Sequence, residues 1–218
     1  MIDFILHIDV HLAALMASYG IWVYALLFLI LFIETGLVVM PFLPGDSLIF
    51  AAGALAAVTM RSTTGGQMNI WVLVAILPLA AVAGDAMNFE IGKNFGERLL
   101  SRFEGRIINR KHIADTEAFF ERHGGKTILL ARFVPFVRTF APFVAGIGRM
   151  HYGRFARFNV VGGLLWAWGF LFLGFFFGNI PFVKNNFEFV IIGIVLISVI
   201  PMFVQFIINK LKARRNAA

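Results

Sequence analysis

Apolar residues form long runs along this chain, and most polar residues gather in the segments between them. A helix needs about 20 apolar residues to cross a hydrocarbon core of roughly 30 Å. We predict four such transmembrane helices, near residues 20–40, 69–91, 156–178 and 187–209. The pattern therefore predicts an all-α membrane protein.

Two further apolar pieces, at 42–59 and 126–148, do not fit as straight spans because prolines lie in or beside them. A proline removes a backbone donor and clashes with the preceding turn, so at membrane depth other protein groups or water must satisfy the freed carbonyls. The expected structural breaks are Pro41, Pro44, Pro135 and Pro142. We predict re-entrant helical hairpins at about 35–60 and 126–148.

The two hairpins are expected to enter from opposite faces. Counting the four spans back from a cytoplasmic C-terminus places the first hairpin outside and the second inside. Opposed hairpins are expected of an inverted repeat, and interrupted segments in corresponding halves point to a transporter's binding site. A short internal sequence similarity supports the repeat. Pro41-Phe42 and Ala52-Gly53 of the first half match Pro135-Phe136 and Ala145-Gly146 of the second.

Basic residues are concentrated in two parts of the chain. Of the 19 Lys and Arg, eight lie from Lys93 to Lys126 and four in the tail at 210–218. The predicted loops of the opposite side carry only Arg61 and Lys184. Cytoplasmic loops carry the excess of positive residues, so we expect both termini in the cytoplasm. The net charge of +7 then reflects orientation in a membrane, and no nucleic-acid partner is expected.

The segment at about 93–124 is charged, yet apolar residues recur in it every four positions. This period is typical of amphipathic helices, which we expect to lie on the cytoplasmic surface. The run at 187–209 reads as a plain anchor before the basic tail. The N-terminus has acids where a secretory signal carries basic residues, so it is expected to stay on the mature protein. One membrane domain is expected over 1–218.

The composition excludes several classes of protein. With 60% hydrophobic and 14% charged residues, the chain is too apolar for a soluble domain of its length. The absence of cysteine excludes disulfides, thiolate metal sites and cysteine nucleophiles. The five histidines show no metal-ligand spacing, and no nucleophile elbow or phosphate loop occurs. We therefore expect no enzyme, cofactor or metal.

Two acids stand at or beside the proline-broken part of the first half. Glu34 follows thirteen apolar or aromatic residues, at a depth where an ionised carboxylate costs on the order of 3 kcal/mol. Such a group binds a proton or faces a polar cavity, and the alternative is an interface glutamate on a span that ends early. Asp46 follows Pro44-Gly45 and could serve as a helix N-cap, a transport group or both. We expect both acids to exchange protons.

Two arginines occupy the broken segment of the second half. Arg132 and Arg138 would not share a face of one continuous helix, but Pro135 makes such a helix unfavourable, so both could meet at a hairpin tip. Arginine presents a planar fork that matches phosphate oxygens. The alternative, snorkelling of the side chain to lipid headgroups, fits Arg132 better than Arg138. We predict that both bind a substrate phosphate.

A secondary polar set lies in the second predicted span. Asp85 and Asn88 could line the same cavity, whereas Glu90 beside Gly92-Lys93 is expected at the interface.

Several local motifs carry a resemblance to a known family. They are Glu34-Thr35-Gly36, Phe42-Leu43-Pro44-Gly45-Asp46, Gly84-Asp85, Gly92-Lys93, His123-Gly124-Gly125, Arg132-Phe133-Val134-Pro135 and Arg138-Thr139-Phe140-Ala141-Pro142. With these motifs the chain resembles the DedA family of bacterial inner-membrane proteins over nearly its whole length. The resemblance implies a VTT-type (SNARE-associated-like) domain with two opposed re-entrant hairpins. It also implies translocation of phospholipid or a lipid carrier, with undecaprenyl phosphate the best-supported substrate, and dependence on the proton-motive force.

The resemblance thus implies a proton-coupled flippase that returns undecaprenyl phosphate across the inner membrane. The family's functional set corresponds here to Glu34, Asp46, Arg132 and Arg138. The expected partners are an anionic lipid (undecaprenyl phosphate or phospholipid), protons and membrane lipids, and a homo-oligomer is left open. The alternatives are a proton-coupled antiporter of small cations or drugs, a phospholipid scramblase, and a non-transporting membrane scaffold.

Overall fold

The computed structural model describes residues 14–16, 18–37, 45–59, 68–103, 126–132, 135–178, 180 and 193. Every element given bounds in these ranges is an α-helix, and no strand occurs in them. In chain order the helices are α3 (Trp22–Gly36), α4 (Gly45–Thr59), α5 (Ile70–Phe103), α7 (Lys126–Ala131), α8 (Pro135–Ile147) and α9 (Tyr152–Phe177). The predicted all-α class is confirmed for the described part of the chain.

Two of the four predicted spans are helices long and apolar enough to cross a membrane. They cover Ile70–Gly96 and Tyr152–Phe177. The first predicted span is wrong in its extent, because α3 has 15 residues and rises about 22 Å, which is short of the roughly 30 Å core. Glu34, Thr35 and Gly36 end this helix in buried positions, so it stops inside the protein. The predicted anchor at 187–209 lies outside the described residues.

The boundary expected after residue 91 is also wrong. Helix α5 continues through Gly92 and Lys93 to Phe103, so the predicted surface segment at 93–124 begins as part of this long helix. Gly92 lets the helix pass this point in close contact with α8, since a Cβ there would collide with the carbonyl oxygen of Phe143. The remainder of that segment, from residue 104 to residue 124, lies outside the described residues.

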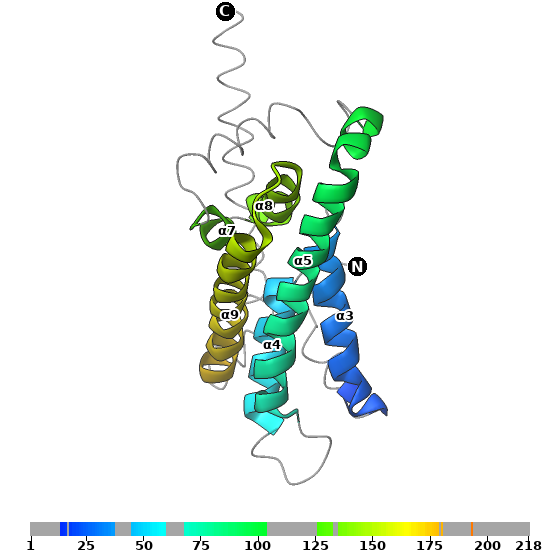
Figure 1. The fold of residues 1–218 in the computed structure, drawn as a ribbon. Coiled ribbons are helices and arrows are strands. Elements are labelled where there is room, and N and C mark those ends of the chain that lie inside the picture. Colours follow the sequence, from blue (N-terminus) through cyan, green and yellow to red (C-terminus); the bar gives the residue numbers. More distant parts are fainter. Residues whose placement is uncertain are drawn as a thin grey trace, which may run out of the picture.

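Helices α4 and α8 occupy opposite halves of the bundle, as Figure 1 shows. Helix α4 packs along α9, whereas α8 packs along α5. Their first turns meet near the middle of the long helices, where Asp46 of α4 pairs with Arg138 of α8. The two opposed re-entrant hairpins stay a prediction. The turn before α4, which contains Pro41 and Pro44, lies outside the described residues.

The prolines of the second hairpin behave differently from each other. Pro135 is the first residue of α8, where its fixed φ suits a helix start and its missing donor costs no helical bond. The break expected at Pro142 is wrong, because α8 continues through it to Ile147. A neighbouring helix supports this turn: the Asn88 side chain on α5 donates to the Thr139 carbonyl at 2.8 Å.

Helices α4 and α9 touch through a reciprocal pair of glycines. A Cβ at Gly53 would collide with the carbonyl oxygen of Leu171, and a Cβ at Gly174 would collide with the carbonyl oxygen of Phe50. Small residues let helix backbones approach closely inside membranes. Each glycine therefore accommodates the backbone of the other helix.

Helices α5 and α8 repeat this contact in the other half of the molecule. A Cβ at Gly92 would meet Phe143, and one at Gly146 would collide with the carbonyl oxygen of Phe89. The sequence similarity between Ala52-Gly53 and Ala145-Gly146 thus marks equivalent packing positions. In each case the short helix of one half lies against a long helix of the other half.

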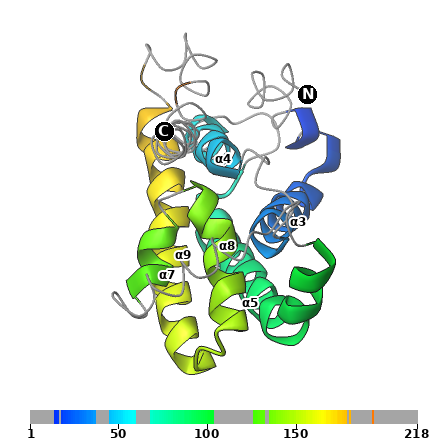
Figure 2. The same cartoon turned by 90° about the horizontal axis from the view of Figure 1, so that it is seen from above.

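Two apolar clusters flank a buried polar zone. One gathers residues of α3, α4, the first part of α5 and the later part of α9, including Leu31 and Leu77. The other joins α5, α7, α8 and the first part of α9 around Phe89 and Phe155. Along α5, Asp85 lies between Leu77 and Phe89, so the polar zone falls between the clusters. Figure 2 looks down the bundle and shows α8 beside α5, against which it packs.

Candidate functional site

Arg138 joins three helices through two ion pairs. Its Nη2 atom lies 2.5 Å from Glu34 Oε1 on α3, and its Nη1 atom lies 2.6 Å from Asp46 Oδ1 on α4. The Arg138 side chain is 14% exposed and that of Glu34 only 2%. The guanidinium therefore holds one oxygen from each of two carboxylates in a largely dehydrated setting, where charge-assisted hydrogen bonds are strong.

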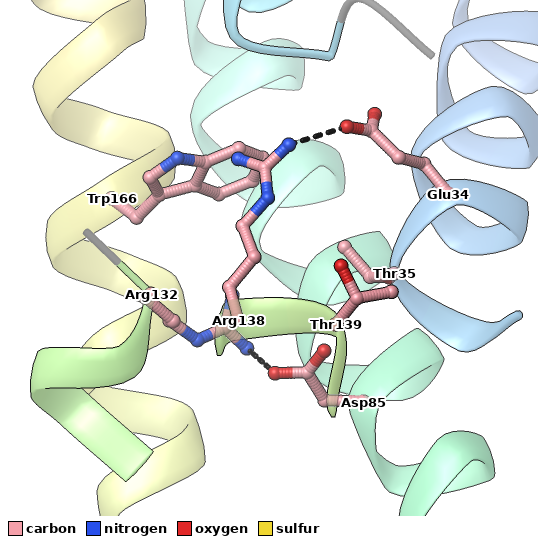
Figure 3. Close-up of a pocket in the computed structure, with 7 residues that line it drawn as sticks. All are labelled: Glu34, Thr35, Asp85, Arg132, Arg138, Thr139 and Trp166. Atoms are coloured by element: carbon pink, nitrogen blue, oxygen red, sulfur yellow. Dashed lines mark hydrogen bonds and ion pairs between the residues drawn. The ribbon is translucent and has the colours of Figure 1, made fainter. Parts of the chain in front are cut away.

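Trp166 completes this cluster from α9. Its Nε1 atom donates to Asp46 Oδ1 at 3.0 Å, the same oxygen that accepts from Arg138. The Arg138 guanidinium carbon lies 5.2 Å from the centre of the Trp166 ring, a cation–π distance. Figure 3 shows the guanidinium beside the indole and directed toward Glu34.

Arg132 forms a third ion pair, in a separate cluster with Asp85 and Asn159. Its Nη2 atom lies 2.5 Å from Asp85 Oδ2 on α5 and 2.5 Å from Asn159 Oδ1 on α9. Gly162 and Gly163 leave room for the side chain, because a Cβ at either position would approach the Arg132 side chain. Arg132 and Asp85 are both 5% exposed as side chains. The snorkelling alternative for Arg132 is therefore wrong, since its guanidinium is enclosed by protein.

The Arg138 and Arg132 clusters border one small cavity. Its lining residues are Glu34, Thr35, Asp85, Arg132, Arg138, Thr139 and Trp166 (Figure 3). The cavity volume is about 10 Å³, near the smallest that holds one water molecule. The conformation described here thus has no room for a phosphate group beside the arginines.

Asn88 lies next to the cavity and ties its walls together. Its Nδ2 atom donates to the carbonyl of Thr35 on α3 at 3.2 Å and to that of Thr139 on α8 at 2.8 Å. Both threonines line the cavity, but Asn88 itself does not. The prediction that Asn88 lines the cavity is therefore wrong; its side chain supports two residues that do line it.

The charges of the two clusters do not cancel. Three carboxylates, of Glu34, Asp46 and Asp85, contact two guanidiniums, so these five groups carry one negative charge when all are ionised. Uncompensated charge in a dehydrated setting is costly, and one bound proton would remove it. Among the described residues, Glu34 Oε2 is buried and has no hydrogen-bond partner, whereas Oε1 accepts from Arg138. The arrangement can therefore store a proton beside an anion-binding guanidinium.

The structure brings together five residues that the sequence singled out. Glu34, Asp46, Asp85, Arg132 and Arg138 lie in the two adjoining clusters. Glu34 is 3% exposed, so the interface-glutamate alternative is wrong. Asp46 lies inside the first turn of α4, and its carboxylate reaches across to α8 and α9.

Glu90 lies away from the site, as the sequence suggested. Its carboxylate pairs with Lys93 at 3.7 Å, and both side chains are about half exposed.

Sequence reasoning missed Trp166 and Asn159 as members of the site. Trp166 is uncharged and lies among glycines and other aromatic residues, so nothing in the sequence distinguishes it. Asn159 is an amide in an otherwise apolar run, which is a signal that could have found it. In the structure its Oδ1 accepts from Arg132 and its Nδ2 donates to the Val82 carbonyl at 3.0 Å.

Comparison with known proteins identifies relatives of this chain. The family model described as the VTT domain matches residues 43–176. Protein DedA of Escherichia coli K12 is 54% identical over 217 residues, covering 100% of this chain and 97% of that protein. An uncharacterized membrane protein of Mycobacterium tuberculosis is 41% identical over 189 residues, covering 87% of this chain and 80% of that protein.

A third relative is more distant, and no structural relative was found. Inner membrane protein YghB of Escherichia coli K12 is 37% identical over 164 residues, covering 75% of this chain and 72% of that protein. No solved structure matches.

Proposed function

Because the chain belongs to the DedA family of VTT-domain membrane proteins, we propose that it carries a lipid phosphate across the bacterial inner membrane in a proton-linked cycle. The observation that carries the proposal is the position of Arg138, whose guanidinium holds carboxylates from two other helices. The preferred substrate is undecaprenyl phosphate, which the family resemblance suggests.

Competition for Arg138 provides the coupling. A guanidinium fork binds two oxygens of a phosphate with the same donors that it offers to carboxylates. Here those donors are taken by Glu34 and Asp46. Protonation of the two acids weakens their hold on Arg138, and the phosphate then takes their place. Release of the phosphate restores the carboxylate pairs and returns the protons.

Arg132 provides a second positive group on the same cavity. Its Nη2 atom donates to Asp85 and Asn159, while its buried Nε has no hydrogen-bond partner in the described part of the chain. We propose that Arg132 joins the phosphate after Arg138, once a proton has neutralised Asp85. An unpaired arginine at membrane depth is costly, so each step exchanges one anionic partner for another.

Loading requires the clusters to open. The cavity of about 10 Å³ is far smaller than a phosphate group, so this conformation is the closed state between loading events. The first turns of α4 and α8 are the parts that must separate, since Asp46 and Arg138 join them. The lipid tail stays in the membrane, beside the glycine-rich helix α9.

The test is translocation in reconstituted vesicles with a pH gradient. Vesicles would contain undecaprenyl phosphate, and an added phosphatase that cannot cross the membrane would report how fast the lipid reaches the outer leaflet. Arg138→Ala and Glu34→Gln are expected to reduce the rate at least tenfold relative to the unchanged protein. Glu90→Gln, which alters an exposed acid on α5, is the matched control and is expected to retain the rate.

Three outcomes would overturn parts of the proposal. Full translocation by Arg138→Ala would show that Arg138 is not needed to bind the phosphate. A rate independent of the pH gradient would indicate a scramblase. Equal transport of a reporter lipid with a phosphate headgroup and of one whose uncharged headgroup lacks phosphate would exclude recognition of the phosphate charge.

A further inference from the structure

The indole of Trp166 donates to a group that the proposed cycle neutralises. Its Nε1 atom lies 3.0 Å from Asp46 Oδ1, and Arg138 Nη1 lies 2.6 Å from the same oxygen. Trp166 is 3% exposed and lines the cavity. Two donors from different helices thus converge on one anionic oxygen.

Trp168 offers an internal comparison on the same helix. Its Nε1 atom donates to the backbone carbonyl of Val74 at 2.9 Å. Buried indole N–H groups usually find a hydrogen-bond partner, and a carbonyl is sufficient for that purpose. A backbone carbonyl is neutral and does not change its protonation in any transport cycle, whereas the partner of Trp166 is an ionisable acid. Structural need alone does not explain why Trp166 points at Asp46.

The carboxylate oxygens of this closed state mark where phosphate oxygens can be held. Arg138 directs Nη1 to Asp46 and Nη2 to Glu34, and Trp166 adds a third N–H at the Asp46 oxygen. An indole N–H is a donor only, and it does not lose its proton at accessible pH. Such a group stabilises an anion at this position and offers nothing to a cation.

We infer that Trp166 is a further phosphate-binding residue, whose N–H donates to a substrate oxygen that replaces Asp46 Oδ1 in the loaded state. This inference rests on the proposed function. The ring also positions Arg138, since the guanidinium lies 5.2 Å from its centre. When Asp46 is protonated, Trp166 and Arg138 lose their shared anionic partner together, so both donors become available to one incoming phosphate.

The first test substitutes the two tryptophans in parallel. Trp166→Phe keeps an aromatic ring under Arg138 but removes the N–H, while Trp168→Phe removes an N–H that faces a backbone carbonyl. A hydrogen bond to a charged group corresponds to about a tenfold or larger change in affinity. Trp166→Phe is therefore expected to raise the Kd for a short-chain isoprenyl phosphate about tenfold, and Trp168→Phe is expected to leave it unchanged.

The second test leaves Trp166 in place, so it does not depend on folding of the variant. The protein labelled with 5-fluorotryptophan gives one ¹⁹F signal for each of its four tryptophans. Isoprenyl phosphate is expected to shift the signal of Trp166 and to leave that of Trp168 in place. The corresponding isoprenyl alcohol, which lacks the phosphate, is expected to shift neither. Inorganic phosphate as a separate probe shows whether the lipid tail is required.

The outcomes separate this inference from the proposed function. An unchanged Kd in Trp166→Phe, or a Trp166 signal that does not respond to isoprenyl phosphate, would overturn the role of Trp166. If Arg138→Ala still lost translocation, the proposed function would stand without it. Full translocation by Arg138→Ala would overturn the proposed function itself.

Discussion

Asp46 and Arg138 lie 92 residues apart in sequence, yet their side chains join at 2.6 Å between Oδ1 and Nη1. Asp46 lies in the first turn of α4 and Arg138 in the first turns of α8, so the contact links the starts of two helices from different halves of the chain. Glu34 binds the other amino group of the same guanidinium. The closed state is thus held by one cation between two acids.

Removing that cation is expected to destabilise the protein strongly. Arg138→Met leaves two buried carboxylates without their partner, and breaking a buried pair in this way costs about 3–5 kcal/mol. The free energy of unfolding in detergent would be measured by denaturant titration. Lys93→Met, which removes a half-exposed cation from α5, is expected to change the free energy of unfolding by less than about 0.5 kcal/mol. Equal effects of the two substitutions would contradict the prediction.

The Arg132–Asp85 pair is expected to show strong coupling. Asp85→Leu leaves a buried guanidinium unpaired, and Arg132→Leu leaves a buried carboxylate unpaired, since both side chains are 5% exposed. The double substitution leaves neither charge. A double-mutant cycle is therefore expected to give a coupling of about 1–3 kcal/mol, with the double variant more stable than the sum of the two single variants predicts. Additive effects would show that the two charges do not interact.

Replacing glycine by alanine is expected to affect stability in opposite ways at two positions of α9. Gly174→Ala places a methyl group against the backbone of Phe50, whereas a Cβ at Gly169 meets no atom of a described residue within 4 Å. Overpacking costs about 1–3 kcal/mol, while Gly→Ala in an open helical position stabilises by up to about 1 kcal/mol. The midpoint of thermal unfolding is expected to fall for Gly174→Ala and to hold or rise for Gly169→Ala. A fall of similar size in both would exclude the proposed close packing.

The pH dependence of translocation is expected to require the carboxylate of Glu34. In the proposed cycle a proton must reach the acids before the phosphate displaces them, so acidifying the loading side is expected to speed translocation. Glu34→Gln is uncharged at every pH and removes the surplus negative charge of the two clusters. Translocation by this variant is expected to be slow and to change little between pH 6 and pH 8, as measured in the phosphatase assay. A pH response as steep as that of the unchanged protein would place the proton elsewhere.

The sequence predicted the chemistry of the site better than the lengths of its helices. Glu34, Asp46, Arg132 and Arg138 stood out because ionisable groups are costly within apolar runs. The apolar run predicted a span near 20–40, but hydropathy could not show that α3 ends at Gly36. That end depends on burial against α5, where Gly84 makes room for Thr35.

The pairing within the site could not be predicted. Sequence spacing suggested two arginines meeting at one phosphate. In the structure, Arg132 pairs with Asp85. Arg138 pairs with Glu34 and Asp46. These choices depend on which helices pack together over separations of 47 to 104 residues. Trp166 was missed for the same reason, because an indole in a glycine-rich span carries no charge to mark it.

The reciprocal glycine contacts bear on how the protein is made. Gly53 reaches its packing partner Leu171 only after more than a hundred further residues have been synthesised. Until then, α4 has no α9 to cover it, although it is already available to the membrane insertion machinery. Helix α5 likewise lacks its packing partner α8 until the second half has been synthesised. Assembly of the first half must therefore be completed by the second, and a ribosome that stalls between them leaves a short apolar helix that its own half does not cover.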